Sequence, residues 1–435
     1  MQVQPFLEPL GIQSLLPMQE ATLAASRIHA KLVLLSATGS GKTIGFLLPV
    51  LEKMTLEKKG TQSLIVVPTR ELALQIEKVF RRMNTGFGVT CCYGGHKREV
   101  EENNLKEAPA VIIGTPGRLA DHIRRGNIST AGISQLVLDE FDKMMEFGFD
   151  EELSFIIQSL PAISFRLLVS ATAALSLPGF VDMSSAEVLN FLSGETAAGL
   201  QLLYCKAPSA DKLDTLFQLL CLWGGRSTIV FCNFRDTVEK TSEWLRDRGL
   251  VNVFYHGALE QDQRETALAK FTNGTADVLV TTDLAARGLD IKHIRYIIHF
   301  QLPADEAAFT HRNGRTARME ESGTALLLLG EDEFLPDYAA EATAFTLPAH
   351  RAPVPEKPKW VTLLVAAGKK DKINKVDIVG FLTQKGQLKK DEVGLIEVKD
   401  FHAFVAVRRS KASSLLAIVK NEKIKGRKVK IDYAK

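Results

Sequence analysis

Cysteine is scarce in this chain: its 435 residues include five, at positions 91, 92, 205, 221 and 232. No two of them stand in a C-x-x-C pair, which argues against a structural zinc site. A small secreted domain held by disulfides would carry more cysteines, at regular spacings. We therefore expect reduced, buried thiols in a cytoplasmic protein.

Long apolar runs are also missing. No stretch of about 18 apolar residues occurs, so the sequence predicts no transmembrane helix. The first residues, MQVQPFLEPLGIQ, lack the basic-then-apolar order of a secretory signal. What remains is typical of a globular protein, with 46% hydrophobic and 24% charged residues, and the length suggests about three domains.

The net charge is small, +3, but it is unevenly distributed. Residues 356–435 hold 20 Lys and Arg against 9 Asp and Glu, a net charge of +11, which leaves −8 for the rest. A basic end on a mildly acidic body is typical of a nucleic-acid-binding region, although a solvated lysine-rich surface gives the same pattern.

Short apolar runs separated by helical stretches occur in two series. The first comprises 32–35, 64–67, 111–113, 136–138 and 167–169; the second comprises 228–231, 251–255, 278–280, 296–299 and 325–329. Such runs are typical of parallel strands that helices cover on both faces. We predict two α/β domains, 1–195 and 196–346, with the boundary where small residues accumulate between Ser184 and Gly199.

The remainder of the chain predicts a linker and a small domain. Residues 347–358 are rich in proline, which favours a stiff, extended linker. In 359–435, apolar strands at 361–365, 395–398, 403–407 and 429–431 are interspersed with helices at 374–385 and 411–420. The order βαββαβ predicts a ferredoxin-like α+β domain.

The most informative segment is Ser36-Ala37-Thr38-Gly39-Ser40-Gly41-Lys42-Thr43. An apolar strand precedes it and a helical segment follows, which is the layout of a nucleotide phosphate loop. In such a loop Lys42 contacts the outer phosphates and Thr43 contacts Mg²⁺. The usual pattern has glycine where this chain has Ser36, and an ordinary glycine-rich turn is the alternative.

Polar residues follow the other strands of the first series, at what would be one edge of the sheet. They are the segments Pro68-Thr69-Arg70-Glu71, Gly114-Thr115-Pro116-Gly117-Arg118, Asp139-Glu140-Phe141-Asp142 and Ser170-Ala171-Thr172. A carboxylate pair beside a phosphate loop suits metal binding by one acid and activation of water by the next. Two exposed acids in a turn are the alternative.

In the second series, Thr281–Asp290 follows a strand, and His311–Arg318 places Arg315 and Arg318 three residues apart. On a helix these arginines share a face, where two guanidiniums suit the charge on a transferred γ-phosphoryl group. Taken alone, the segment also fits a pair of surface arginines.

Together these segments resemble the DEAD-box RNA helicases over nearly the whole chain. The motifs are, in order, ATGSGKT, PTRELALQ, Gly94-Gly95, TPGRL, DEFD, SAT, VFCN, the pair Gln261 and Arg264, TTDLAARGLD and HRNGRTAR. The resemblance implies two tandem RecA-like domains and an RNA-dependent ATPase that uses ATP and Mg²⁺.

The resemblance also implies roles at the nucleotide. Gln19 would read adenine, and Ser40, Gly41, Lys42 and Thr43 would hold the phosphates and Mg²⁺. Asp139 would bind the metal, and Glu140 would activate water. Asp290 would contact the ribose, and Arg315 and Arg318 would act as arginine fingers from the second domain.

Further roles concern RNA. Ser170, Thr172, Asp142 and His311 would couple the nucleotide state to RNA binding. The residues that would line the RNA backbone path are Arg70, Gly95, Thr115, Arg118, Gln261, Arg264 and Thr281. The chain departs from the family pattern at Phe141, usually alanine, and at Asn313, usually apolar, and no aromatic residue stands at the usual distance upstream of Gln19.

The last domain resembles the RNA-binding domain of DbpA-type DEAD-box helicases, a divergent RRM. The aromatic positions of an RRM are largely absent, and Phe401 and Phe404 fit a core as well as a stacking platform. We expect recognition by basic side chains: Lys369, Lys370, Lys372, Arg408, Arg409, Lys423, Lys425, Arg427 and Lys428.

The sequence thus predicts a monomeric, ATP-dependent RNA helicase without a membrane partner. The DbpA-type likeness implies a hairpin of 23S ribosomal RNA as target, in precursors of the large ribosomal subunit. The alternatives are a general RNA helicase or chaperone without a specific ribosomal target, a duplex-DNA translocase on the same scaffold, and an RNA chaperone that has lost hydrolysis.

Overall fold

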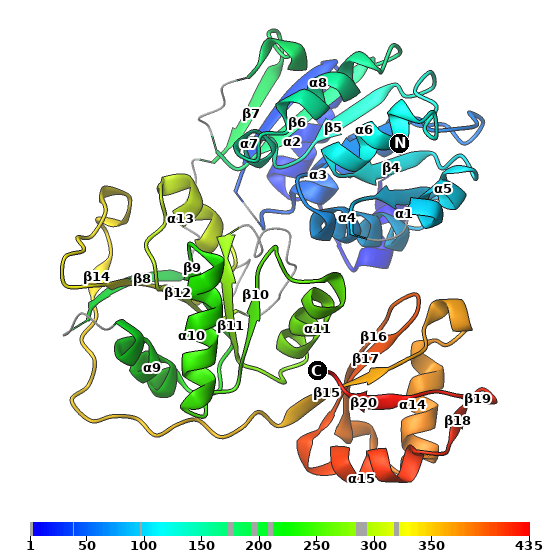
Figure 1. Ribbon diagram of the computed structural model, residues 1–435. Helices are drawn as coiled ribbons and strands as arrows, with labels where there is room; N and C mark the ends of the chain where they lie inside the picture. Colours follow the sequence, from blue (N-terminus) through cyan, green and yellow to red (C-terminus); the bar gives the residue numbers. More distant parts are fainter. Residues whose placement is uncertain are drawn as a thin grey trace. The chain divides into compact units, whose positions relative to one another are not determined.

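The computed structural model describes residues 3–37, 39–95, 98–172, 177–192, 199–207, 212–283, 294–316 and 322–435. Within these ranges the chain forms two compact units that divide near residue 197. The first unit holds the N-terminal α/β domain, and the second holds another α/β domain together with the C-terminal domain (Figure 1).

The first domain is built on a parallel sheet in the order β3-β4-β2-β5-β6-β1-β7. Its strands are β1 (Lys31–Ser36), β2 (Ser63–Val66), β3 (Val89–Cys92), β4 (Val111–Gly114), β5 (Gln135–Leu138), β6 (Phe165–Ser170) and β7 (Glu187–Phe191). All strands of the first predicted series are present. The sheet also extends through β7 into 184–199, the segment predicted as the boundary.

Burial along β1 shows how this sheet is covered. Leu32 and Leu34 pack into one apolar cluster, whereas Val33 and Leu35 pack into another. Since neighbouring residues of a strand point to opposite faces, helices cover both sides. These helices are α1 (Gln4–Leu7), α2 (Pro17–Ser26), α3 (Lys42–Glu52), α4 (Arg70–Arg82), α5 (Arg98–Leu105), α6 (Pro116–Arg124), α7 (Phe141–Glu146) and α8 (Asp150–Gln158).

The second domain repeats this architecture, with the sheet order β10-β11-β9-β12-β13-β8-β14. Its strands are β8 (Leu200–Lys206), β9 (Thr228–Cys232), β10 (Asn252–Tyr255), β11 (Val278–Thr282), β12 (Tyr296–His299), β13 (Gly323–Leu329) and β14 (Thr343–Ala344). Its helices are α9 (Lys212–Trp223), α10 (Arg235–Asp247), α11 (Gln261–Thr272) and α13 (Glu306–Asn313).

The C-terminal domain is a four-stranded antiparallel sheet within the described residues, in the order β16-β17-β15-β20. Its elements are β15 (Trp360–Val365), α14 (Lys375–Gln384), β16 (Val393–Val398), β17 (Ala403–Arg408), α15 (Arg409–Val419), the hairpin β18 (Lys423–Ile424) and β19 (Arg427–Lys428), and β20 (Ile431–Tyr433). The predicted βαββαβ order is confirmed. The α/β class with a final α+β domain is confirmed as well.

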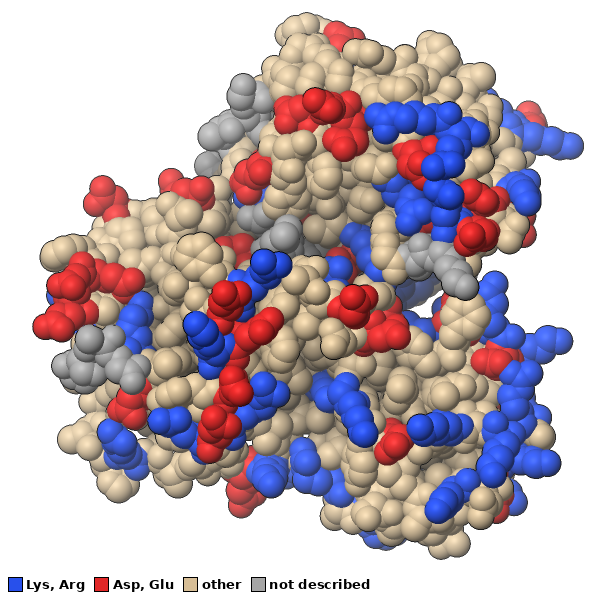
Figure 2. All heavy atoms as spheres, viewed as in Figure 1, with Lys and Arg blue, Asp and Glu red and all other residues tan. Residues whose placement is uncertain are grey.

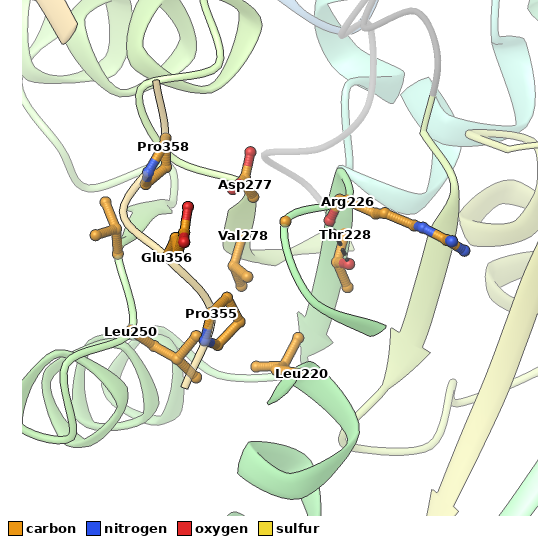
Figure 3. A pocket seen from close by; sticks show the side chains of 11 residues that line it. Leu220, Arg226, Thr228, Leu250, Asp277, Val278, Pro355, Glu356 and Pro358 are labelled. Carbon is orange, nitrogen blue, oxygen red and sulfur yellow. Dashed lines mark hydrogen bonds between the residues drawn. The ribbon is translucent and has the colours of Figure 1, made fainter. Parts of the chain in front are cut away.

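The proline-rich linker lies against the second domain. Pro355 and Pro358 line a small cavity with Leu220, Leu250 and Asp277 (Figure 3). A Cβ built on Gly224 would lie 3.6 Å from the Cγ of Pro355. The linker therefore lies on the second domain at Pro355 and Pro358, while most of its other residues are exposed.

The sheet of the C-terminal domain has one face in its own core and one face against the second domain. Leu363 and Val405 belong to the core of the small domain. On the other face, Phe404 is 1% exposed and packs with Ala269 of α11. The hydroxyl groups of Thr362 and Thr275 lie 2.7 Å apart across the same contact. The second domain thus covers the face on which an ordinary RRM stacks bases.

Candidate functional site

The phosphate loop joins the end of β1 to the start of α3. Gly39 and Gly41 have φ angles of +85° and +87°, a region that glycine adopts without strain. A Cβ on Gly41 would lie 2.7 Å from the Nε2 of Gln19. The strand, the left-handed glycines and the helix start therefore have the geometry of a loop that turns backbone N–H groups toward phosphates.

Ser36, which replaces a glycine of the usual pattern, is 1% exposed at the end of β1. Its Oγ is 2.7 Å from the Oγ of Ser40, so the two hydroxyls are hydrogen-bonded across the loop. The serine thus forms a hydrogen bond within the loop and does not obstruct it.

Three charged residues meet beneath this loop: Lys42, Asp139 and Glu140 are 8%, 3% and 5% exposed. The Nζ of Lys42 and the Oε2 of Glu140 are buried and have no hydrogen-bond partner among the residues that the structure describes. Burying polar atoms without partners costs free energy, which a bound ligand can offset. Glu140 also has φ of +51°, a left-handed conformation that is strained for a residue with a side chain.

Asp139 has the electrostatics expected of a cation ligand. Burial raises the pKa of its carboxyl to about 7, and the neighbouring Glu140 adds to the rise, while the Lys42 ammonium opposes it. The backbone N–H of Glu140 donates to Asp139 Oδ1 at 2.9 Å. A dication would stabilise the ionised carboxylate that burial disfavours, so this acidic site fits Mg²⁺.

Gln19 lies against the same loop. Its Nε2 donates to the carbonyl oxygen of Gly41 at 3.0 Å, and its Oε1 accepts from the backbone N–H of Leu16 at 2.9 Å. Both ends of the amide are therefore fixed next to the phosphate loop, and the predicted contact with adenine stays a prediction.

The predicted coupling residues of the first domain are in contact. Ser170 Oγ donates to the carbonyl oxygen of Thr172 at 3.0 Å and accepts from its N–H at 3.1 Å. Thr172 Oγ1 lies 3.5 Å from Asp142 Oδ2. The SAT segment is thus linked to the acidic segment at the start of α7.

Arg70 and Gly95, two predicted RNA-path residues, meet at the ends of neighbouring elements. The Nη1 of Arg70 is 3.5 Å from the carbonyl oxygen of Gly94, and its guanidinium lies 4.9 Å from the ring centre of Tyr93. A Cβ on Gly95, whose φ is +91°, would lie 2.7 Å from Arg70 Nη1. Glycine is favoured here by the left-handed backbone conformation, and a longer side chain would also displace the end of Arg70.

Thr115 and Arg118 belong to the start of α6, with Thr115 as its N-cap residue. The N–H of Thr115 donates to the carbonyl oxygen of Cys92 at 3.0 Å, and Arg118 Nε lies 3.5 Å from Glu101 Oε2. The structure therefore brings all four predicted residues of the first domain to elements around β3 and β4.

In the second domain, Arg312 joins three strand ends, which the sequence analysis missed. This side chain is 1% exposed and makes two hydrogen bonds to Asp283, at 2.5 and 2.6 Å. It also donates to Asn233 Oδ1 and to the carbonyl oxygen of Gln301, each at 2.7 Å. The available signal was the neighbouring His311 together with the motifs VFCN and TTD, whose last residues, Asn233 and Asp283, come directly after β9 and β11.

The two arginine fingers were expected on one helix face, and for Arg315 this is wrong. Helix α13 ends at Asn313 with Gly314 as C-cap, so Arg315 lies in the following turn. Arg315 is 6% exposed, and His311 is buried within α13. Arg318 and Asp290 lie outside the described residues.

Of the remaining predicted RNA-path residues, Gln261 and Arg264 lie on α11. Gln261 Nε2 donates to Glu265 Oε1 at 2.5 Å, and Arg264 donates from Nη2 to the hydroxyl of Tyr255 at 3.2 Å. Thr281 is fully buried, and its Oγ1 donates to the carbonyl oxygen of Tyr255 at 2.9 Å. Tyr255 thus contacts Arg264 through its hydroxyl and Thr281 through its backbone carbonyl, whereas Gln261 bonds within α11.

The basic residues of the C-terminal domain divide into two groups. One group is exposed, and blue side chains gather over this domain in the space-filling view (Figure 2); it consists of Lys369, Lys370, Lys372, Lys423, Lys425, Arg427 and Lys428. The other group lies near the start of this domain: Arg408 lies 4.5 Å from the ring centre of Trp360 in β15, and Arg409 donates to the carbonyl oxygen of Pro358 in the linker at 2.6 Å.

The structure shows what surrounds Phe141 and Asn313, the two residues that depart from the family pattern. Phe141 is fully buried and belongs to the apolar cluster on one face of the first sheet. Asn313 is 8% exposed, and its Oδ1 lies 2.9 Å from the Nε2 of His299, which is also buried. The asparagine thus gives the Nε2 of a buried imidazole a partner, whereas the Nδ1 of His299 has none among the described residues.

Family comparisons cover each domain in turn. The DEAD/DEAH box helicase family matches residues 16–177, the helicase conserved C-terminal domain matches 211–320, and the DbpA RNA binding domain matches 362–433. In the part of the chain that the structure describes, no helix is both long and apolar enough to span a membrane.

Similar proteins agree with this assignment. The ATP-dependent RNA helicase DbpA of Escherichia coli (strain K12) is 33% identical over 443 residues, covering 99% of this chain and 96% of that protein. The DbpA of Bacillus subtilis (strain 168) is 30% identical over 470 residues, covering 98% of this chain and 96% of that protein.

A solved structure, S. cerevisiae Dbp5 bound to RNA and ADP BeF3, superposes with a TM-score of 0.67 at 27% identity, covering 76% of this chain and 87% of that chain. With this agreement in sequence, domain order and fold, the chain belongs to the DEAD-box family of RNA-dependent ATPases, as an ATP-dependent RNA helicase of the DbpA type.

Proposed function

We propose that ATP is hydrolysed at the site formed by the phosphate loop and the acidic pair of the first domain. The buried, unpartnered Nζ of Lys42 and Oε2 of Glu140, within the described residues, are the observation that carries this assignment. Lys42 would neutralise the outer phosphates. Glu140 would orient the attacking water and take its proton, as the bond from the γ-phosphorus to the bridging oxygen breaks.

Thr43 and Asp139 would hold Mg²⁺ at this site. When bound, the ion supplies positive charge that offsets the charge developing on the phosphates. Gln19 would recognise adenine, and Asp290 the ribose. Arg315 and Arg318, from the second domain, would stabilise the transferred γ-phosphoryl group.

We propose further that ATP and RNA favour an arrangement in which the two domains share both ligands. Such a ligand acts by binding one conformation more tightly than the others. Ser170, Thr172, Asp142 and His311 would couple the two sites. The RNA backbone would follow the residues Arg70, Gly95, Thr115, Arg118, Gln261, Arg264 and Thr281. One RNA strand would be held in a bent form that no longer fits a duplex, so short duplexes separate.

For the RNA target, we propose a hairpin of 23S ribosomal RNA in precursors of the large ribosomal subunit. The match to the DbpA RNA binding domain and the exposed basic residues of the C-terminal domain support this proposal. Because phosphate contacts dominate such binding, affinity should fall steeply with salt.

The test compares the ATPase activity of the full-length chain on a panel of 23S ribosomal RNA fragments. In a variant with Lys369, Lys370 and Lys428 changed to Glu, the RNA concentration for half-maximal activity on the preferred fragment should rise. The slope of log affinity against log salt should fall by about 2–3. A matched control changes Lys385, Lys411 and Lys420, which are also exposed, to Glu.

Strong stimulation by one hairpin fragment, weakened only in the first variant, supports the ribosomal target. Equal stimulation by all fragments would favour the alternative, a general RNA helicase without a specific ribosomal target.

We also propose that the protein is a monomer and acts in the cytoplasm. The five buried, unpaired cysteines are compatible with a reducing compartment, and analytical ultracentrifugation tests the oligomeric state.

A further inference from the structure

A buried carboxylate lies beneath the predicted RNA-path residues of the first domain. Glu101 of α5 is 1% exposed. Its Oε1 accepts the backbone N–H of Tyr93 at 2.7 Å. Its Oε2 lies 2.7 Å from His122 Nε2 and 3.5 Å from Arg118 Nε. One side chain therefore contacts the loop before Gly94-Gly95 and the first turns of α6.

The hydrogen bonds of His122 define its tautomer. The ring is fully buried, and its Nδ1 lies 3.0 Å from the amide nitrogen of Asn127. Because an amide nitrogen donates, Nδ1 is the acceptor, and the ring proton is on Nε2. His122 thus donates to Glu101 and is itself held by Asn127.

A metal ion is an alternative occupant, because Cys92, Glu101 and His122 offer ligand atoms within 4.8 Å of one another. The geometry opposes it. The Nε2 of His122 donates its proton to the carboxylate, and the guanidinium of Arg118 borders the same oxygen. Burial raises the pKa of the Cys92 thiol, with the negative charge of Glu101 as the next cause, so the thiolate needed for a metal is disfavoured.

We propose that Glu101 is a positioning residue for the RNA path, with His122 as its fixed donor. From Glu101 the contacts run to Tyr93, whose ring lies under the guanidinium of Arg70, and directly to Arg118. Holding these groups in place before RNA binds reduces the entropy lost on binding. The inference rests on the proposed RNA path.

Substitutions of His122 test the donor at Nε2. Glutamine places an amide nitrogen near the position of Nε2, whereas asparagine reaches only the position of Nδ1. His122→Gln should therefore retain RNA affinity. His122→Asn should raise the RNA concentration for half-maximal ATPase activity roughly tenfold, the scale of one or two side chains that must be ordered on binding. The probe is a single-stranded oligo(U) RNA, and the ATP KM and the RNA-saturated kcat should not change.

Glu101→Gln should act like His122→Asn, since the amide group offers a donor where His122 and Arg118 also donate. Glu102→Gln is the matched control, because Glu102 is the next residue of α5, 34% exposed, and paired with Arg98 at 3.2 Å. The same RNA concentration for half-maximal ATPase activity in all variants would overturn the inference. Two other results would also overturn it. One is a joint loss of kcat, RNA affinity and thermal stability in the variants, with no recovery in His122→Gln. The other is one bound zinc ion per unmodified chain that His122→Asn releases. Failure of RNA to stimulate the unmodified chain would instead contradict the proposed RNA path.

Discussion

At the scale of single residues, charge and burial are combined in different ways among the residues that we propose for the nucleotide site. Lys42 and Glu140 are buried with atoms that lack partners among the described residues. Arg315 is buried in a turn that the C-cap of α13 positions. A bound ligand would offset the cost of burying the first pair, and the role of Arg315 as an arginine finger stays a prediction.

Replacing Arg315 with alanine should abolish RNA-stimulated hydrolysis. An arginine finger acts mainly on the charge that develops in the transition state, so ATP affinity should change little, while kcat should fall by about 10³-fold or more. Turnover and binding of a fluorescent ATP analogue measure the two quantities. Unchanged turnover would contradict the assignment of Arg315, and Arg351→Ala, at a side chain 69% exposed, serves as control.

His299 makes the stability of the second unit depend on pH. Burial lowers the pKa of its imidazole to about 3, with the Arg312 cation as the next cause. The unfolded chain therefore binds a proton below about pH 6.5 that the folded chain does not, and stability falls as the pH is lowered from 6.5 toward 3. Between pH 7 and pH 5 this group should remove about 2 kcal/mol.

Urea unfolding followed by tryptophan fluorescence measures this effect, because Trp223, Trp244 and Trp360 all belong to the second unit. The free energy of unfolding of His299→Gln should fall less between pH 7 and pH 5 than that of the unmodified chain, whatever the stability of the variant at pH 7. An equal loss in both proteins would refute the role of His299. The exposed His350→Gln should leave the loss unchanged.

At the scale of elements, strand ends are connected by buried polar side chains. Arg312 connects α13 with the ends of β9, β11 and β12 through its partners Asn233, Asp283 and Gln301. The helix that precedes Arg315 is thereby fixed to the sheet. This connection explains how a turn residue can hold a defined position.

Arg312→Met should destabilise the second unit by about 3 kcal/mol, because Asp283 loses both charge-assisted hydrogen bonds. The tryptophan-detected urea midpoint reports the change. Arg351→Met, which breaks an exposed ion pair with Asp214, should cost less than about 1 kcal/mol. A similar small effect in both variants would show that Arg312 has no special structural role.

At the scale of the whole molecule, the C-terminal domain is held by the second domain through α11. Thr362 accepts one hydrogen bond from Asn273, its hydroxyl lies 2.7 Å from that of Thr275, and His402 lies 3.3 Å from Glu265. Pro355 and Pro358 of the linker also line a cavity with residues of the second domain. The two domains of the second unit should therefore move as one body.

Ala269→Arg should separate them, because Ala269 is 3% exposed against Phe404 and has no room for a longer side chain. The radius of gyration measured by small-angle X-ray scattering should increase, while ATPase activity at saturating oligo(U) RNA should persist. Asp262→Arg, at an exposed position of the same helix, is the control. Identical scattering from both variants would mean that this contact does not hold the domain.

Much of the fold followed from the sequence. Apolar runs such as 32–35 and 228–231 are strands of parallel sheets, because a strand that is apolar on both faces needs helices on both sides. The phosphate loop was readable because its glycines adopt left-handed backbone angles that few other residues tolerate. The position of Arg315 in a turn could not be predicted, because spacing alone does not show where α13 ends.

The sequence by itself determined the family and the order of the three domains, and it predicted the residues of the nucleotide site, since these depend on local patterns and on motifs in a fixed order. Only the tertiary structure decided which groups meet across long separations: Arg312 with Asp283, Glu101 with His122, and Phe404 with Ala269. Such contacts depend on which strands are neighbours and which faces are covered. Packing of the whole chain sets both, and no local pattern records them.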